Sequence, residues 1–141
     1  MIAPAVSARF HLSLAVADLE AARAFYAGLL GCTVGRRGPG WLDFSFFGHQ
    51  LTCTFHPDRV RTVAANDLEG LHFGAIVPAA DFERLAAALT AAAVTFLVPP
   101  RVEDAGAASE RRKMVFLDPS GNAVEIKSYR DESRLYSSTM T

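Results

Sequence analysis

The sequence contains one strand–helix unit twice, and this repeat limits the folds that the chain can adopt. The unit is FHLSLAVADLEAARAFYAGLLG in the first half and LHFGAIVPAADFERLAAALTAA in the second. In the two copies His11 aligns with His72, which lies 61 positions further on (72 − 11). Because such self-similarity marks one supersecondary unit that is used repeatedly, both halves are expected to share a topology.

The first half is predicted to form a strand, a helix and three further strands. Apolar and polar residues alternate over 9–16, which is typical of a strand with one buried face. Asp18 is a suitable helix N-cap, apolar residues follow it at helical spacing, and Gly31 suits the helix C-terminus. The remaining strands are expected at 33–37, 41–47 and 49–55.

The second half is predicted to repeat this order and to end in a hairpin. The segment MVFLDPSGNAVEIKSY, residues 114–129, indicates two strands joined by a turn at 118–122, where Asp, Pro, Gly and Asn favour a tight reversal of the chain. This turn aligns with that of the first half, since Gly121 follows Gly48 by 73 positions (121 − 48). The other elements are expected as a strand at 71–77, a helix at 81–93, a strand at 95–98 and a loop at 99–112.

These elements predict an α+β fold of two β-α-β-β-β modules, whose sheets would face each other across a cleft with the helices outside. We expect one domain over residues 1–141. It comprises module one at 9–56, a linker at 57–70, module two at 71–129 and a polar tail at 130–141.

Composition and charge argue against nucleic-acid and membrane partners. Half of the residues are hydrophobic, the formal net charge is −1, and no basic stripe indicates nucleic-acid binding. No apolar run is long enough to span a membrane, and the N-terminus lacks a signal-peptide pattern. Cys32 and Cys53 lack metal-like spacing, so reduced thiols and a cytoplasmic location are expected.

Two histidines and one glutamate are candidate metal ligands. His11 and His72 occupy equivalent positions on the first strands of the two modules, and small residues such as Ser13 and Gly74 leave room beside them. Glu125 lies on the last strand of module two. Two imidazoles and a carboxylate that converge on a cleft form a facial triad with open positions on a divalent metal ion. For each histidine alone, an ordinary core or surface position is the alternative, and for Glu125 the alternative is a solvated carboxylate paired with Lys127.

His56 and Tyr129 are candidate catalytic residues. They lie 73 positions apart (129 − 56), so the repeat places both on the cleft side of their module. Either could act as an acid or base, or could orient a metal ligand. For His56, a strand-end histidine beside Pro57 is an equal alternative. His49 is expected to have a structural role in its turn.

The predicted loop at 99–112 carries charged side chains whose role the sequence leaves open. They could form a lid over the cleft or an ordinary solvated charge run. The residues concerned are Arg101, Glu110 and Arg112.

Three segments of the chain carry a resemblance to a known superfamily. They are FHLSLAVADLEAARAFYAGLLGC, HFGAIV and FLDPSGNAVEIKSY. Together they resemble the vicinal oxygen chelate superfamily, which includes glyoxalase I, type I extradiol dioxygenases, fosfomycin-resistance thiol transferases and bleomycin-resistance proteins. The segment WLDFSFFGHQL is similar to a short subgroup described as predicted ring-cleaving dioxygenases. The resemblance implies an extradiol-type dioxygenase, with Fe(II) on His11, His72 and Glu125, O₂, and a catechol-like substrate bound through two vicinal oxygens.

Alternative functions and metals stay open. Glyoxalase-type isomerases place a fourth ligand, Glu or Gln, at the repeat counterpart of Glu125, which is Thr52 here (125 − 73). Fosfomycin-type thiol transferases use the same three ligands, but they usually also have a cation loop and phosphonate-binding basic residues, and the sequence shows no pattern that marks either. A metal-free antibiotic-binding protein would need no ligands. The larger ring-cleaving enzymes carry a catalytic His and Tyr in strands before the carboxylate ligand, and residues 111–117 contain neither. Zn, Mn or Ni are open in place of iron.

A homodimer is expected from the apolar surface of the predicted helices. This surface exceeds what one small sheet would cover, and symmetric dimers commonly bury such surface. It includes Phe25, Leu30 and the alanine-rich stretch at 86–93. Members of the superfamily often dimerise, so the metal site could be built within one chain or from two.

Overall fold

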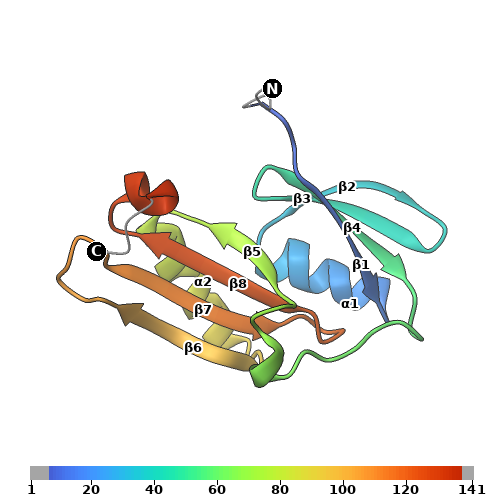
Figure 1. Ribbon diagram of the computed structural model, residues 1–141. Helices are drawn as coiled ribbons and strands as arrows, with labels where there is room; N and C mark the ends of the chain where they lie inside the picture. The colour runs from blue at the N-terminus through green and yellow to red at the C-terminus, as the bar shows by residue number, and fades with distance from the viewer. Residues whose placement is uncertain (1–6, 138–141) are drawn as a thin grey trace. The chain divides into compact units, whose positions relative to one another are not determined.

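The structure, a computed structural model, describes residues 7–137 of the chain. The chain divides into two compact units, Met1–Val60 and Arg61–Thr141, and each contains one four-stranded sheet (Figure 1). The predicted polar tail at 130–141 is described only as far as residue 137. No helix of the described part is long and apolar enough to cross a membrane.

The first unit is a mixed sheet with a helical segment on one face. Its strand order is β1-β4-β3-β2, in which β1 is parallel to β4 and the other neighbours are antiparallel. The elements are β1 (His11–Val16), α1 (Leu19–Arg23), a π-helical segment (Ala24–Leu29), β2 (Thr33–Gly38), β3 (Trp41–Phe46) and β4 (His49–Phe55).

The ends of the first helical segment follow from two residues. Asp18 caps its start, since Oδ1 of Asp18 accepts hydrogen bonds from the backbone N–H of Glu20 (2.8 Å) and of Ala21 (3.0 Å). Gly31 ends it with φ of +77°, a left-handed conformation that favours glycine. Both predicted boundaries are therefore confirmed.

The second unit repeats this topology. Its strand order is β5-β8-β7-β6, with β5 parallel to β8. Ser13 pairs with Thr52, and Gly74 pairs with Glu125, so Thr52 is the repeat counterpart of Glu125. The predicted fold of two β-α-β-β-β modules is confirmed. The elements are β5 (Phe73–Ile76), α2 (Ala79–Ala91), β6 (Phe96–Glu103), β7 (Arg111–Leu117) and β8 (Ala123–Tyr129), with 3₁₀ turns at Ala65–Asp67 and Glu132–Tyr136.

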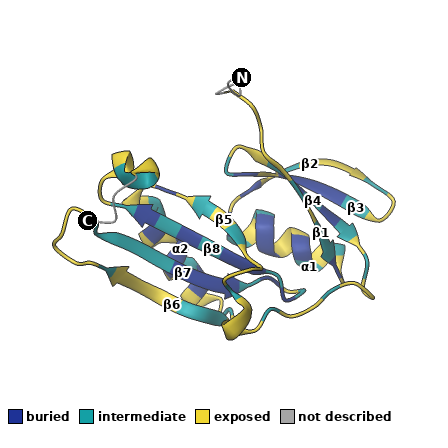
Figure 2. Cartoon of the chain, in the orientation of Figure 1, coloured by how far each residue is buried: buried dark blue, intermediate teal, exposed yellow. Residues whose placement is uncertain are grey.

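Each sheet buries one face and leaves the other largely polar. The buried residues, dark blue in Figure 2, lie in the helices and in strands such as β7 and β8. In the first unit, Tyr26 packs against Phe44 with ring centroids 5.4 Å apart, and both side chains are buried. In the second unit, α2 packs against β7 and β8. The buried apolar residues there are Phe82, Leu85, Leu89, Met114, Phe116, Val124 and Ile126. Because burial of these groups drives folding, it also decides which side of each strand stays open.

Two expectations from the sequence are wrong. Phe25 and Leu30 are buried inside the first unit, where the ring of Phe25 packs edge-on against Tyr26, so they offer no spare apolar surface to a second copy. Half of the predicted loop at 99–112 is strand, because β6 extends to residue 103 and β7 begins at residue 111. Charged side chains alternate there along the open face, and this pattern conceals the strands from a search for apolar alternation.

Gly74 makes the pairing of β5 with β8 possible. A Cβ atom at this position would lie 1.6 Å from the backbone oxygen of Glu125, far inside contact distance. The two strands can therefore approach at Glu125 only because residue 74 has no side chain.

We predict that Gly74→Ala destabilises the protein by forcing β5 away from β8. Overpacking of this kind lowers the free energy of unfolding by about 1–3 kcal/mol. Gly28→Ala is the matched control, since a Cβ atom there meets nothing within 4 Å in a helical segment, and it should leave stability unchanged or raise it by up to about 1 kcal/mol. Urea unfolding followed by circular dichroism measures both, and equal stabilities would contradict the prediction.

Candidate metal centre

The turn before β8 fixes the position of Glu125. Asp118 is buried, and its Oδ1 accepts hydrogen bonds from two backbone N–H groups of the turn, at 2.8 and 2.9 Å. Gly121 has φ of +86°, which a side chain would strain. The register of β8 follows from this turn. Because both neighbours of Glu125 in the strand are buried, its side chain points to the open face.

The linker orients the ring of His72. The N–H of Val63 donates to the carbonyl of Gly121 (2.9 Å), and a Cβ atom on Gly121 would lie 2.6 Å from Cα of Thr62. The linker thus lies against the hairpin turn, and further along the chain the carbonyl of Leu68 contacts Nδ1 of His72. Since a carbonyl can only accept, Nδ1 carries a hydrogen, and in the neutral form of the ring the lone pair is on Nε2.

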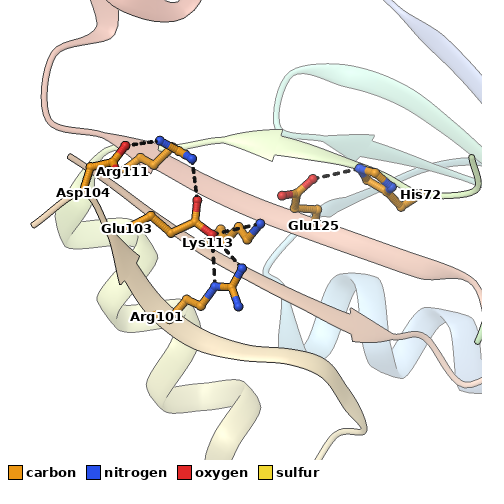
Figure 3. A network of polar contacts seen from close by, with 7 residues as sticks. All are labelled: His72, Arg101, Glu103, Asp104, Arg111, Lys113 and Glu125. Atoms are coloured by element: carbon orange, nitrogen blue, oxygen red, sulfur yellow. Dashed lines mark hydrogen bonds and ion pairs between the residues drawn. The ribbon is translucent and has the colours of Figure 1, made fainter. Parts of the chain in front are cut away.

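His72 and Glu125 meet on the open face of the second sheet (Figure 3). Nε2 of His72 lies 2.9 Å from Oε2 of Glu125, and the two side chains are 33% and 12% exposed. One nitrogen and one oxygen donor atom therefore lie side by side, and the other ring nitrogen of His72 is hydrogen-bonded to a backbone carbonyl. This is the arrangement that metal-binding histidines usually show. The structure brings together two of the three predicted ligands.

His11, the third predicted ligand, lies in the first unit. It is exposed at the start of β1, where it pairs with Gln50 of β4. Among the residues that the structure describes, no group of three or more His, Cys, Asp or Glu side chains is placed to hold a metal ion. The role of His11 as a ligand stays a prediction.

Asp43 is a buried carboxylate that no pattern in the sequence singled out. It is 4% exposed, although it lies on the polar face of the first sheet, opposite Thr52. Its Oδ1 accepts a hydrogen bond from Oγ1 of Thr52 (2.6 Å), and its Oδ2 accepts one from Nε2 of Gln50 (3.2 Å) and lies 3.6 Å from Nε of Arg36. These partners offset the cost of burying the charge. The register of the hairpin around Gly48 was the signal that could have placed Asp43 beside Thr52.

The two predicted catalytic residues lie apart from the ligands of their own unit. Tyr129 shares the face of Glu125 but follows it by four residues, which is about 13 Å along a strand. Its neighbour in β7 is Arg111. His56 directly follows β4, and its backbone N–H donates to the carbonyl of Val16 (3.0 Å). A catalytic role for either residue stays a prediction.

His49 has a structural contact at the start of β1. Its Nδ1 accepts a hydrogen bond from the backbone N–H of Phe10 (2.9 Å), and the carbonyl of Phe10 accepts one from the backbone N–H of Gln50 (2.9 Å). Both bonds hold the residue before His11 against β4. The contact therefore supports the predicted structural role of His49.

Charged residues of β6 and β7 form an ion-pair network on the open face (Figure 3). Glu103 contacts Arg101 (2.6 Å), Arg111 (2.7 Å) and Lys113 (3.1 Å). Burial by itself would raise the pKa of Glu103, but hydrogen bonds from Lys113 and Arg101 and the charges of Lys113 and Arg111 outweigh it and lower the pKa. Glu103 is therefore ionised at neutral pH.

Two of the three charged residues that were considered as parts of a lid, Arg101 and Arg112, do not lie in a loop. Arg101 and Arg112 lie in strands, and Arg112 pairs with Glu83 of α2 (3.0 Å). Glu110 lies in the remaining loop, where its Oε2 accepts a hydrogen bond from the backbone N–H of Gly106 (2.7 Å). This bond closes the loop on itself.

The two cysteines are buried free thiols. Burial raises the pKa of Cys32 to about 11, and a backbone hydrogen bond from Phe47 offsets only part of this rise. At neutral pH the thiol of Cys32 stays protonated and is a poor nucleophile.

Comparison with known proteins identifies the family. A family model described as the Glyoxalase/Bleomycin resistance protein/Dioxygenase superfamily matches residues 9–126. The chain belongs to this superfamily. The resemblance seen in the sequence is thereby confirmed. Members of the superfamily are mostly enzymes, generally use divalent metals and bind small-molecule substrates.

Individual relatives differ in their described activities. Glutathione transferase FosA of Serratia marcescens is 30% identical over 118 residues, which cover 82% of this chain and 77% of FosA. The crystal structure of a glyoxalase/bleomycin resistance protein/dioxygenase from Alicyclobacillus acidocaldarius has a TM-score of 0.78 at 31% identity, covering 92% of this chain and 96% of that chain. The fosfomycin resistance protein FosX of Listeria monocytogenes has a TM-score of 0.72 at 17% identity, covering 95% and 99%, and shows likeness of fold alone.

We predict that the Glu103 network stabilises the protein at pH values above the ordinary pKa of glutamate. In acid, this contribution to stability is lost. A carboxyl whose pKa is lower in the folded state than in the unfolded state contributes stability that is fully present above the unfolded pKa, about 4.3. That contribution is lost as the pH falls through the folded pKa. Thermal unfolding of Glu103→Gln between pH 7 and pH 3 should show a weaker loss in acid than the wild type. Glu69→Gln, an exposed control, should keep the wild-type profile, and an unchanged profile in Glu103→Gln would contradict the prediction.

Proposed function

We propose that the chain is a metal-dependent enzyme in which His11, His72 and Glu125 hold one divalent ion. The contact of 2.9 Å between Nε2 of His72 and Oε2 of Glu125 carries this proposal. Two ligands that meet a metal at right angles, with bonds near 2.1 Å, have donor atoms about 3 Å apart. The spacing of the two side chains therefore fits an ion bound by both.

The hydrogen bonding of His72 supports the same proposal. Because Nδ1 of His72 donates to Leu68, a neutral ring turns the lone pair of Nε2 toward the carboxylate of Glu125. Two lone pairs at this distance repel unless a proton or a metal cation lies between them. A metal ion would satisfy both donor atoms at once.

Thr52 supports a set of three protein ligands rather than four. It occupies the counterpart of Glu125, but its hydroxyl donates to Asp43 at 2.6 Å and it carries no charge. Three protein ligands leave open positions for two adjacent oxygens of a substrate. When bound, the ion would polarise these oxygens and stabilise negative charge that develops on them. The mixed nitrogen and oxygen ligand set suits Fe(II), which we expect, and also Zn, Mn or Ni.

We infer that group transfer is better supported than ring cleavage as the reaction at this centre. The resemblance of WLDFSFFGHQL favours an extradiol-type dioxygenase that uses O₂ and a catechol-like substrate. However, β7 places Val115 directly opposite Glu125, and residues 111–117 contain no His or Tyr that could act as an acid or base beside it. The relative that is 30% identical is described as a glutathione transferase. Thiol transfer is therefore our first candidate and extradiol cleavage our second.

We predict that Glu125→Ala loses most of its metal and keeps its fold. Removal of a residue that only hydrogen-bonds to a ligand weakens metal binding roughly 10–100-fold. Glu125 is proposed as a direct ligand, so its loss should weaken metal binding by more than this. Metal analysis by mass spectrometry, on protein purified anaerobically and on protein reloaded with Fe(II), measures the effect. Glu83→Ala on α2 is the control and should keep wild-type metal content. Unchanged occupancy in a folded Glu125→Ala protein would reject the metal centre.

We predict thiol consumption and no oxygen uptake by the metal-loaded protein. Glutathione with fosfomycin tests transfer, and a panel of catechols with an oxygen electrode tests ring cleavage. His72→Ala, which lacks a proposed ligand, serves as the inactive control in both assays. Oxygen uptake with a yellow ring-opened product would reverse the order of the two candidates, because extradiol cleavage makes a conjugated oxo-acid.

A further inference from the structure

The only two lysines of the chain stand directly opposite each other on the face that carries Glu125. The chain has 14 Lys and Arg residues, and all others are arginines. Lys113 of β7 pairs with Lys127 of β8, and Val115 and Glu125 form the pair two residues along. Because alternate residues of a strand share one face, both lysines and Glu125 point to the same side of the sheet, opposite the buried residues beneath α2.

The positive charge of this face is only partly neutralised. Glu103 is shared by three cations, and Asp104 contacts Arg111 at 2.7 Å. Lys127 has no ion-pair partner among the described residues. Apart from the His72–Glu125 pair, the face has two carboxylates and four cations. The cations are Arg101, Arg111, Lys113 and Lys127.

This excess of positive charge is local and unfavourable by itself. The whole chain has a formal net charge of −1, so the charge on this face does not follow the composition. Like charges directly opposite each other on neighbouring strands destabilise a sheet. An anion between the two ammonium groups would convert their repulsion into two charge-assisted hydrogen bonds.

We propose that Lys113 and Lys127 bind an oxyanion group, a carboxylate or a phosphate-like group, of the substrate held at the metal centre. Lys127 lies two residues beyond Glu125, which is about 7 Å along the strand. One small molecule can span this separation. Ile76, the exposed neighbour of Lys127 in β5, adds an apolar flank. Oxyanion binding needs only the two lysines, whereas its link to turnover rests on the proposed metal function.

The two lysines can be observed selectively. Reductive methylation with ¹³C-formaldehyde labels Lys113, Lys127 and the N-terminal amine, and it preserves their positive charge. Metal-free protein in EDTA is titrated with inorganic phosphate and separately with acetate, at constant ionic strength maintained with sodium chloride. Saturable shifts of both lysine signals are expected, and the tighter anion identifies the class of oxyanion. Absent shifts, or equal shifts with chloride alone, would overturn the proposal.

Four variants separate anion binding from folding and from the metal centre. Lys127→Met keeps the aliphatic stem and should weaken phosphate binding about tenfold. Glu103→Gln releases Lys113 and should strengthen binding, whereas Arg84→Met on α2 should not change it. Glu125→Ala should still bind phosphate without metal, so failure of the metal centre is distinguished from failure of the anion site. Wild-type affinity in a folded Lys127→Met protein would refute the proposal.

Discussion

The close approach of β5 to β8 at Gly74 holds the candidate metal centre together. The backbone of β5 lies so near the carbonyl of Glu125 that no side chain fits between them, and the same pairing brings His72, which precedes β5, beside Glu125. The turn at 118–122 sets the register of β8, and the linker supplies the carbonyl of Leu68 to the ring. Backbone interactions thus preorganise the two side chains, as a metal site requires.

The features that could be predicted from the sequence were those that follow from the repeat and from strand and helix periodicity. The aligned histidines and the shared hairpin spacing predicted both modules and the equivalence of Thr52 with Glu125, because repeat positions follow the backbone whatever side chain occupies them. The strand ends at 99–103 and 111–113 were missed, because their charged side chains pair across an open face and lack apolar alternation. The carbonyl of Leu68 could not be predicted at all, since a backbone acceptor in a linker has no residue signature.

The two modules keep one geometry but give their carboxylates different partners. In the second module, Glu125 projects from the last strand beside Val115, whose apolar side chain leaves the carboxylate free to bind a metal. In the first module, the carboxylate lies one strand over at Asp43, where hydrogen bonds from Thr52 and Gln50 occupy its oxygens. A fully hydrogen-bonded carboxylate supports its neighbours, whereas one beside a histidine nitrogen, as Glu125 is beside Nε2 of His72, has the neighbour that the proposed metal site requires. The partners of each carboxylate therefore decide its role.

The metal ligands alone do not determine the reaction, because proteins of one superfamily can place the same ligands in a common fold and catalyse different reactions. At the proposed centre, chelation would position two substrate oxygens, and the residues just beyond the ligands would then select which molecule supplies them. On this sheet those residues are Val115, which offers no acid or base opposite Glu125, and the lysine pair Lys113 and Lys127, which is the next cross-strand pair on the same face. An apolar side chain beside the ion and two cations about 7 Å away favour a substrate with one chelating end and one anionic end over an uncharged aromatic diol.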